Sequence, residues 1–392
     1  MRATAAQLVE VGNATEQQLN AAVVSDVDKV EKALLHLAAF ASQTRHSANR
    51  QLAKFAAQPE VVGTGARAAK QLGEIQPGPR TVTAAQAQDK VRIGFTTDMS
   101  SLYSDVDGKN GAMAIQMAID DFGGKVLGKP IELLTADHQN KADIAASKAR
   151  EWFDTQNVDA MIGGTNSGTA LATAKVAEEK KKVYIVNGAG SSALTNAACS
   201  PYVVHYAYDT VALAKGTGGA VVKQGGKDWF FLTADYAFGH ALETDTANVV
   251  KAAGGAVKGT VRAPLNTSDF SSFLLQAQSS GAKILGLANA GGDTIASIKA
   301  ASEFGITKTM KLAGLLMFVT DIHSLGLKDT QGMYLTDSWY WDKDDASREF
   351  AKKFFSKAKS MPTSIHAANY SAATTYLKAV TAAKTTDSDK VM

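Results

Sequence analysis

The sequence predicts an α/β protein with two doubly wound parallel-sheet lobes, a ligand cleft between them and an α-helical extension at the N-terminus. Three observations lead to this prediction. From residue 90 onward, short apolar strands alternate with amphipathic helices, which is the pattern of parallel sheets covered by helices on both faces. The alternation starts a second time after Tyr206. Small polar residues follow several of the strands, and ligands bind at the carboxyl ends of strands in such sheets.

The composition is that of an ordinary globular protein. Of the 392 residues, 45% are hydrophobic and 20% are charged, so the chain can bury a sizeable core in two or three domains. Forty-one Lys and Arg against 38 Asp and Glu exclude a strongly cationic nucleic-acid binder. The single cysteine, Cys199, excludes an internal disulfide framework and a multi-cysteine metal cage. No apolar run of about 18 residues is present, so no membrane span is predicted.

The first 88 residues form the predicted extension. Apolar residues at helical spacing predict an amphipathic helix over 15–56, and a stretch rich in glycine and proline predicts a linker over 61–79. Ala85-Gln86-Ala87, just before Gln88, has the small-x-small form of a signal-peptidase site. The apolar run that a cleavable signal needs does not precede it. We therefore expect an unrelated helical segment in place of an export signal.

The first series of elements begins at residue 90. VRIGFTT over 91–97 is an apolar run of strand length, and Ile115, Ile119 and Phe122 share one side of the helix expected next. By the same criteria, further strands are expected over 130–136, 160–162, 183–186 and 202–206. Helices are expected over 108–122, 142–154 and 168–179.

The second series begins with a helix over 210–223 and the strand WFFLT over 229–233. Further strands are expected over 257–262, 284–288, 310–314 and 333–336. Helices are expected over 238–252, 270–279, 293–304, 344–358 and 366–383. Because about ten strands are many for one sheet of this type, we expect two similar lobes.

Polar loops at the strand ends are the candidate ligand-binding elements. They cover 96–98, 163–167, 187–192, 233–236 and 289–293. Ser167, Ser191 and Ser192 stand where helices begin, so their hydroxyls and the free backbone N–H groups suit a ligand carboxylate. The same serines can also cap their own helices, and both roles are compatible.

The sequence gives little support for an enzyme. Gly188-x-Gly190-x-x-Ala193 after a strand superficially matches a dinucleotide fingerprint, but the segment before Pro201 is too short for the helix that would hold a pyrophosphate. The seven histidines do not cluster, and no zinc-enzyme, phosphate-loop or nucleophile-elbow motif occurs. We expect no enzyme activity, cofactor or metal, and keep an NAD-dependent oxidoreductase as an alternative.

Several segments match a known family in its order along the chain. They are VRIGFTTDMSSLYSDVDG, AMIGGTNSGTALA, VYIVNGAGSSALT, FLTADYAFG and GMYLTDSWYWD. Through them, residues 90–390 resemble the type I periplasmic solute-binding proteins of ABC transporters, in the leucine/isoleucine/valine-binding branch. The resemblance implies a periplasmic, monomeric protein that closes by hinge motion around a small carboxylate-bearing solute and delivers it to an ABC permease.

The resemblance also implies the domain boundaries. The first lobe should comprise 90–207 and 340–390, and the second lobe 208–339. Crossings between the lobes are expected near 206–208 and 338–340, and a third beyond Val391. The family usually continues with a strand-bearing segment that returns to the second lobe. Without it, a neighbouring strand would expose backbone donors and acceptors.

Ligand-binding residues of the first lobe carry over from the family's motifs. Asn166 and Ser167 match the loop that holds the ligand carboxylate. Ala189 and Ser191 match the second carboxylate loop, and Tyr103 lies in the opening loop that caps the pocket. We expect Ser191→Ala to weaken binding by roughly 1–3 kcal/mol through loss of a charged hydrogen bond.

The second lobe carries over less completely. Tyr236 matches the tyrosine that lies over the ligand, and Asn289 and Asp293 surround the next ligand loop. Amino-acid binders typically place a carboxylate for the ligand ammonium after the strand that here runs into apolar Phe318. Asp293 or Asp321 could substitute. Since an unpaired buried ammonium is costly, an aromatic or other organic acid is an equal contender to an amino acid.

Two further readings stay open. One is a cytoplasmic ligand-sensing protein on the same fold, with the helix over 15–56 as its partner-binding arm. The other is a fusion or truncation product without binding activity.

Overall fold

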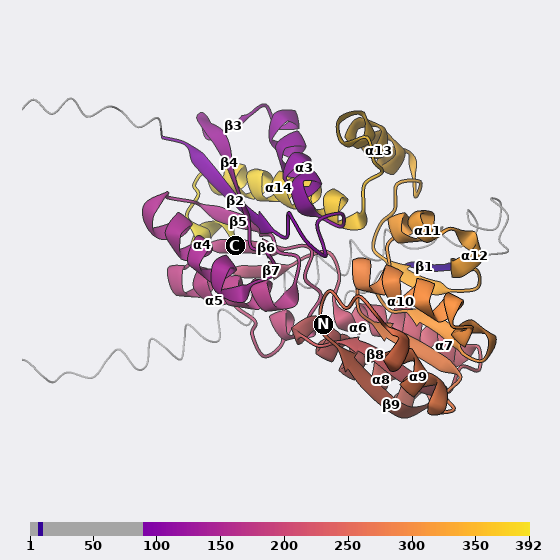
Figure 1. Cartoon of the computed structure of the whole chain (residues 1–392). Helices are drawn as coiled ribbons and strands as arrows, with labels where there is room; N and C mark the ends of the chain where they lie inside the picture. The colour runs from indigo at the N-terminus through magenta and orange to yellow at the C-terminus, as the bar shows by residue number, and fades with distance from the viewer. Residues whose placement is uncertain (1–6, 11–88) are drawn as a thin grey trace, which may run out of the picture. The chain divides into compact units, whose positions relative to one another are not determined.

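The computed structural model of the chain describes residues 7–10 and 89–392 (Figure 1). The predicted helix over 15–56, the linker over 61–79 and the cleavage-like sequence at 85–87 lie outside the described residues. Within the described part, no helix is both long enough and apolar enough to cross a membrane.

A six-stranded sheet forms the centre of what we call the first lobe. Its strand order is β3-β4-β2-β5-β6-β7, and all pairs are parallel except β3 with β4. The strands are β2 (Val91–Thr97), β3 (Lys125–Val126), β4 (Lys129–Asp137), β5 (Ala160–Gly163), β6 (Val183–Val186) and β7 (Val203–His205). The helices of this part of the chain are α3 (Gly108–Asp121), α4 (Ala142–Thr155) and α5 (Ser167–Lys180), and later α13 (Asp345–Ala358), α14 (Ser364–Ala383) and α15 (Ser388–Val391).

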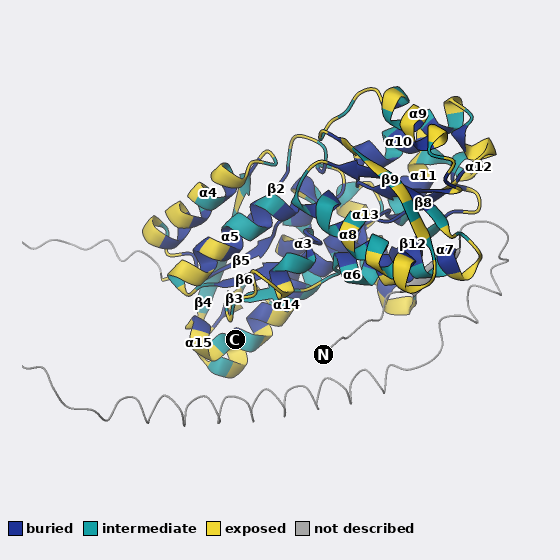
Figure 2. Ribbon diagram, turned by 90° about the horizontal axis from the view of Figure 1, so that it is seen from below, coloured by how far each residue is buried: buried dark blue, intermediate teal, exposed yellow. Residues whose placement is uncertain are grey.

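Alternating side chains of the first sheet enter two separate cores. Ile162 packs in a cluster with residues of α3 and α14, whereas its neighbour Met161 packs with Trp152 of α4 and residues of α5. Successive side chains of a strand point to opposite faces, so α3 with α14 and α4 with α5 cover the two faces. The central strands β2, β5 and β6 are almost entirely buried, whereas β4 and β7 are half-buried. Figure 2 shows that the outer sides of the covering helices are exposed.

A four-stranded parallel sheet forms the centre of the second lobe, in the order β11-β10-β8-β9. The strands are β8 (Asp228–Ala234), β9 (Ala256–Ala263), β10 (Ile284–Ala288) and β11 (Lys311–Gly314). The α-helices are α6 (Thr210–Leu213), α7 (Gly219–Lys223), α8 (Ala237–Ala252), α9 (Ser271–Ser279), α10 (Gly292–Glu303), α11 (Val319–Leu325) and α12 (Leu327–Thr330). These two sheets confirm the predicted α/β class.

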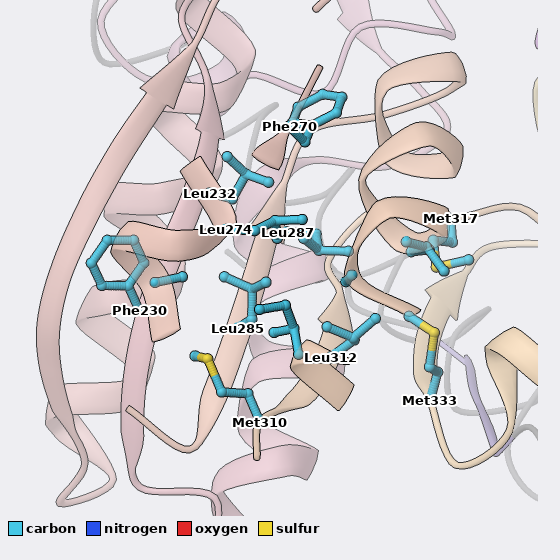
Figure 3. Close-up of a cluster of buried hydrophobic side chains, with 14 of the residues drawn as sticks. Phe230, Leu232, Phe270, Leu274, Leu285, Leu287, Met310, Leu312, Met317 and Met333 are labelled. Carbon is cyan, nitrogen blue, oxygen red and sulfur yellow. The ribbon is translucent and has the colours of Figure 1, made fainter. Parts of the chain in front are cut away.

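The second sheet is buried on both faces along β8 and β10, whereas alternate residues of its edge strand β9 are exposed. On one face, Leu285 and Leu287 of β10 pack with Phe270, Leu274 and other apolar side chains, a cluster drawn in Figure 3. On the other face, β8 contributes Trp229 and Phe231, both fully buried and stacked with ring centroids 5.8 Å apart. In a sheet covered in this way, the loops at the strand ends are the part left open to form a site.

The expected strand over 333–336 pairs outside this sheet. It forms β12 (Tyr334–Asp337), which pairs antiparallel with β1 (Gln7–Glu10), with Leu8 opposite Thr336. No pattern in the sequence indicated β1. In the described part of the chain, an N-terminal segment thus forms backbone hydrogen bonds with one edge of β12.

The expected helix over 210–223 is continuous but irregular. Its middle, Ala214–Gly218, is a π-helical segment between α6 and α7. A Cβ atom on Gly216 would lie 2.1 Å from Thr336 Oγ1, so glycine is required where this helix meets β12. Such π-helical segments arise where a contact interrupts the regular ladder.

Candidate functional site

Side chains from both lobes line one cavity at the carboxyl ends of the strands. It contains about 310 Å³ of space not filled by atoms, part of it open to solvent. Its lining residues are Tyr103, Val106, Thr165, Asn166, Ser167, Gly188, Ala189, Gly190, Tyr208, Tyr236, Phe238, Ala290, Leu316 and Phe318.

The loop after β5 brings the start of α5 to the cavity. Asn166, with φ of +72°, is the N-cap residue; its Oδ1 accepts from the N–H groups of Gly168 at 2.9 Å and Thr169 at 3.2 Å. Asparagine tolerates positive φ better than most residues. Ser167 Oγ accepts from the N–H of Ser191 at 3.1 Å, which leaves its own hydrogen available for a ligand oxygen.

The loop after β6 approaches closely because it carries two glycines. A Cβ atom on Gly188 would lie 2.8 Å from Thr165 Cγ2, and one on Gly190 would lie 2.7 Å from Tyr208 Cε2. Only the 3₁₀ helix Ser192–Thr195 follows, not the long helix of a dinucleotide-binding unit. Close packing of this loop therefore accounts for the Gly-x-Gly pattern.

The opening loop after β2 is held by a buried carboxylate. Asp98 Oδ2 accepts from the N–H of Tyr103 at 2.8 Å and from Asn140 Nδ2 at 2.6 Å. These bonds place the Tyr103 hydroxyl 2.7 Å from the Tyr236 hydroxyl, which comes from the N-cap residue of α8 in the second lobe. Desolvation raises the pKa of both tyrosines, so both remain protonated hydrogen-bond donors at neutral pH.

The remaining lining side chains are mainly apolar. Phe238, Leu316 and Phe318 come from the second lobe, and all three are buried. Tyr208, near the first expected crossing, donates its hydroxyl to the carbonyl of Gly188 at 2.8 Å. Its ring edge is therefore fixed against the loop after β6.

Among the described residues that line the cavity there is no Asp, Glu, Lys, Arg or His. Its polar groups are the hydroxyls of Ser, Thr and Tyr, the amide of Asn166, and backbone groups. Such a cavity can satisfy a small anion through neutral donors at a helix N-terminus, but it has no carboxylate for a ligand cation.

Of the nine sequence-predicted residues, the structure brings six together. Tyr103, Asn166, Ser167, Ala189, Tyr236 and Phe318 line the cavity. Ser191, Asn289 and Asp293 are buried but do not line it.

Local hydrogen bonds explain the three residues that lie elsewhere. Ser191 Oγ accepts from the N–H of Ala193, at 3.4 Å, as the cap of the 3₁₀ helix. Asn289 binds the hydroxyls of Thr294 and Ser297 on α10. Asp293 Oδ2 accepts from the N–H of Asn266 at 3.2 Å. These side chains stabilise their own loops.

Asp321 does not supply the missing carboxylate either. Its Oδ2 accepts from the N–H of Phe318 at 2.9 Å, at the start of α11, and it is not among the lining residues. Burial raises the pKa of Asp321 to about 6. The Asp321 side chain therefore caps the N-terminus of α11.

Sequence reasoning missed several lining residues, including Val106, Thr165, Tyr208, Phe238 and Leu316. Thr165 directly precedes the predicted Asn166, and Phe238 follows the predicted Tyr236 by two residues at the start of α8, so spacing could have indicated both. Tyr208 lies at an expected crossing between lobes. No group of three or more metal-ligating side chains occurs among the described residues.

Comparisons with known proteins agree with this architecture. A family described as periplasmic binding protein matches residues 90–392. A Burkholderia mallei periplasmic binding protein of known structure is 71% identical, with a TM-score of 0.77 over 77% of this chain and 81% of that chain. A Burkholderia xenovorans branched-chain amino acid ABC transporter periplasmic ligand-binding protein is 42% identical, with a TM-score of 0.68 and the same coverage of both chains.

A curated relative is more distant. The Leu/Ile/Val-binding protein homolog 6 of Brucella melitensis is 28% identical over 243 residues. The match covers 60% of this chain and 59% of that protein's length.

Proposed function

Because the chain belongs to the periplasmic binding protein family, we propose that it is the solute-binding component of an ABC transporter and binds a small carboxylate in its inter-lobe cavity. It binds the solute in the periplasm, delivers it to a membrane permease and does not change it covalently. The Burkholderia xenovorans relative carries this transport role in its name.

The observation that carries the ligand class is the uncharged cavity lining. The Ser167 hydroxyl and the N-terminus of α5 suit a carboxylate. Phe238, Phe318 and the tyrosines suit an aromatic or branched apolar body. An α-ammonium group would be desolvated without a charged partner among the described lining residues, at a cost of several kcal/mol. The ligand is therefore an organic acid without an ammonium group.

A solved neighbour fits this assignment. A solute-binding protein of an ABC transporter from Rhodopseudomonas palustris was solved with p-hydroxybenzoic acid; it is 25% identical, with a TM-score of 0.70. The relatives named for leucine, isoleucine and valine, or for branched-chain amino acids, favour the alternative, an amino acid ligand.

Matched ligand pairs test the proposal. Phenylalanine and 3-phenylpropanoate differ only in the ammonium group, as do leucine and 4-methylpentanoate; p-hydroxybenzoate completes the panel. A ligand at 100 times its Kd stabilises the folded state by about 2.7 kcal/mol, so thermal unfolding detects binding. We expect the acids to raise Tm and the amino acids to have little effect. A larger shift with the amino acids would refute the ligand class, and no shift with any compound would count against the binding function.

A further inference from the structure

A chain of buried hydrogen bonds adjoins the cavity and is not used by the ligand contacts proposed above. Thr97 Oγ1 lies 2.6 Å from Asp107 Oδ2 and 2.7 Å from Thr165 Oγ1. Asp107 Oδ1 accepts from Asn369 Nδ2 at 2.7 Å, and Asn369 Oδ1 accepts from Asn187 Nδ2 at 2.7 Å. Each of these five side chains is at most 2% exposed. Breaking one of these hydrogen bonds would leave a buried polar atom without that partner, which costs folding free energy. A change at one of the five side chains should therefore affect its neighbours in the chain of hydrogen bonds.

Both ends of the chain reach the cavity loops. Thr165 lines the cavity itself, and Asn187 directly precedes the lining residue Gly188. Asp107, the N-cap residue of α3, occupies the middle. A Cβ atom on Gly111 would lie 1.9 Å from Asp107 Oδ1, so glycine is needed on α3 for the carboxylate to fit. One carboxylate thus connects the loops after β5 and β6.

The charge of Asp107 decides the direction of the hydroxyl bonds. An ionised carboxylate only accepts, so the Thr97 hydroxyl donates to it, and the Thr97 oxygen takes the hydrogen of Thr165. The Thr165 oxygen also accepts from the N–H of Asp98 at 3.2 Å. When Asp107 is protonated, it can donate to Thr97, and Thr97 can donate to Thr165. The hydrogen of Thr165 then becomes available to the cavity.

We propose that Asp107 is a positioning residue for ligand binding, and that its protonation reverses the Thr97–Thr165 chain so that Thr165 donates toward a bound anion. This inference rests on the proposed function in one respect, the negative charge of the ligand. Protonation also removes a buried negative charge near that anion. Both effects have the same sign and predict tighter binding at lower pH.

The surroundings of Asp107 favour its titration near neutrality. Burial raises the pKa of Asp107 to about 7, although its hydrogen bonds from Thr97 and Asn369 act in the opposite direction. His366, whose Nε2 lies 3.0 Å from the Asp107 carbonyl, has its pKa lowered by burial to about 4. His138, whose Nε2 lies 3.0 Å from the Thr165 carbonyl, has its pKa lowered by burial to about 4 as well.

Other titratable groups face the chain. Burial raises the pKa of the hydroxyls of Tyr184 and Tyr208, whose interactions with Asp107 raise it further. Asp98 contacts Thr165 through its backbone N–H and accepts hydrogen bonds within its own loop. Asp98 and Asp137 both interact electrostatically with His138, so the experiment must separate Asp107 from these acids by substitution.

Calorimetry at about pH 5.5, 7 and 8.5 tests the proposal, with p-hydroxybenzoate and 3-phenylpropanoate as probes, because these values bracket the expected titration. We expect the wild-type protein to bind about 3- to 10-fold more tightly at the lowest pH than at the highest, as for gain of one hydrogen bond. Asp107→Asn should remove this dependence. Asp337→Asn, which changes another carboxylate of raised pKa, should keep it. A dependence that persists in Asp107→Asn, or its absence in the wild type, would overturn the proposal.

A ligand-free measurement separates this inference from the proposed function. The Asp107 carboxyl can be titrated by ¹³C NMR in the wild type and in Thr97→Val, which removes the donor hydroxyl at similar volume. Loss of that hydrogen bond should raise the pKa of Asp107 by about one unit. An unchanged pKa would refute the chain. If none of the acids binds, the proposed function fails, and this titration still decides whether the chain exists.

Discussion

Ser167 offers the sharpest test of how the cavity holds a carboxylate. Its Oγ accepts from the Ser191 N–H at 3.1 Å, and its hydrogen is available to the ligand. A hydrogen bond to a charged group contributes about 1.5–3 kcal/mol, which corresponds to roughly 10- to 150-fold in Kd. We therefore expect Ser167→Ala to weaken binding of p-hydroxybenzoate by that factor in titration calorimetry.

The same substitution has a separate effect on stability. It leaves the buried Ser191 N–H without its acceptor, at a cost of about 1–3 kcal/mol. Thermal unfolding of the unliganded protein measures this loss of stability, so the loss of stability can be separated from the loss of affinity. The affinity loss should remain when both proteins are compared well below their unfolding temperatures.

Ser191→Ala is the matched control. Its Oγ is buried, lies 3.4 Å from the Ala193 N–H and does not line the cavity. We therefore expect less than about a 3-fold change in Kd, since no ligand hydrogen bond is lost. This revises the sequence-based expectation for Ser191. Equal losses for the two variants, or an unchanged Kd for a folded Ser167→Ala, would refute the reasoning.

Three other predictions concern closure, core and pH. The Tyr103 and Tyr236 hydroxyls lie 2.7 Å apart, so a double-mutant cycle with Tyr103→Phe and Tyr236→Phe should give a coupling energy of about 0.5–3 kcal/mol in the free energy of ligand binding, measured by calorimetry. If the two losses of binding free energy are additive, the hydroxyls do not bond directly in the liganded state. Leu285→Ala should lower the free energy of unfolding by about 2–5 kcal/mol, because this side chain is fully buried. Leu275→Ala, at a position that is 62% exposed, should change the free energy of unfolding by no more than about 0.5 kcal/mol. Equal effects of the two substitutions in denaturant unfolding would contradict the assigned core. Burial raises the pKa of Asp337 to about 7, so between about pH 4 and 7 the native state binds more protons than the unfolded state, and stability should fall as pH rises through this range. Asp337→Asn should reduce the dependence of Tm on pH in this range. An unchanged dependence would refute the role assigned to Asp337.

Hydrophobic patterning predicted every strand of the two sheets except the two-residue β3. The strands over 91–97, 183–186 and 284–288 agree with the structure to the residue, because each is an apolar run of strand length bounded by a turn. The short helices α11 and α12 were not predicted. They have too few residues for a periodic pattern, and tertiary contacts decide them.

The site was predictable where a residue's role depends on its place at a strand end. Ser167 and Tyr236 reach the cavity because the carboxyl ends of parallel strands converge there. Spacing could not distinguish Ser191 or Asn289 from a lining residue, because the choice between a ligand and a helix cap depends on atomic geometry. The Thr97–Asp107–Asn369 chain joins residues far apart in sequence, and no local pattern predicts it.

The pairing of β1 with β12 has a practical consequence for producing the protein. A recombinant form that starts at Asp89 would lose the strand Gln7–Glu10, so β12 would no longer have this partner strand. Unpaired edges recruit strands from other molecules. We expect such a shortened protein to self-associate in light scattering at concentrations where the full chain stays dispersed.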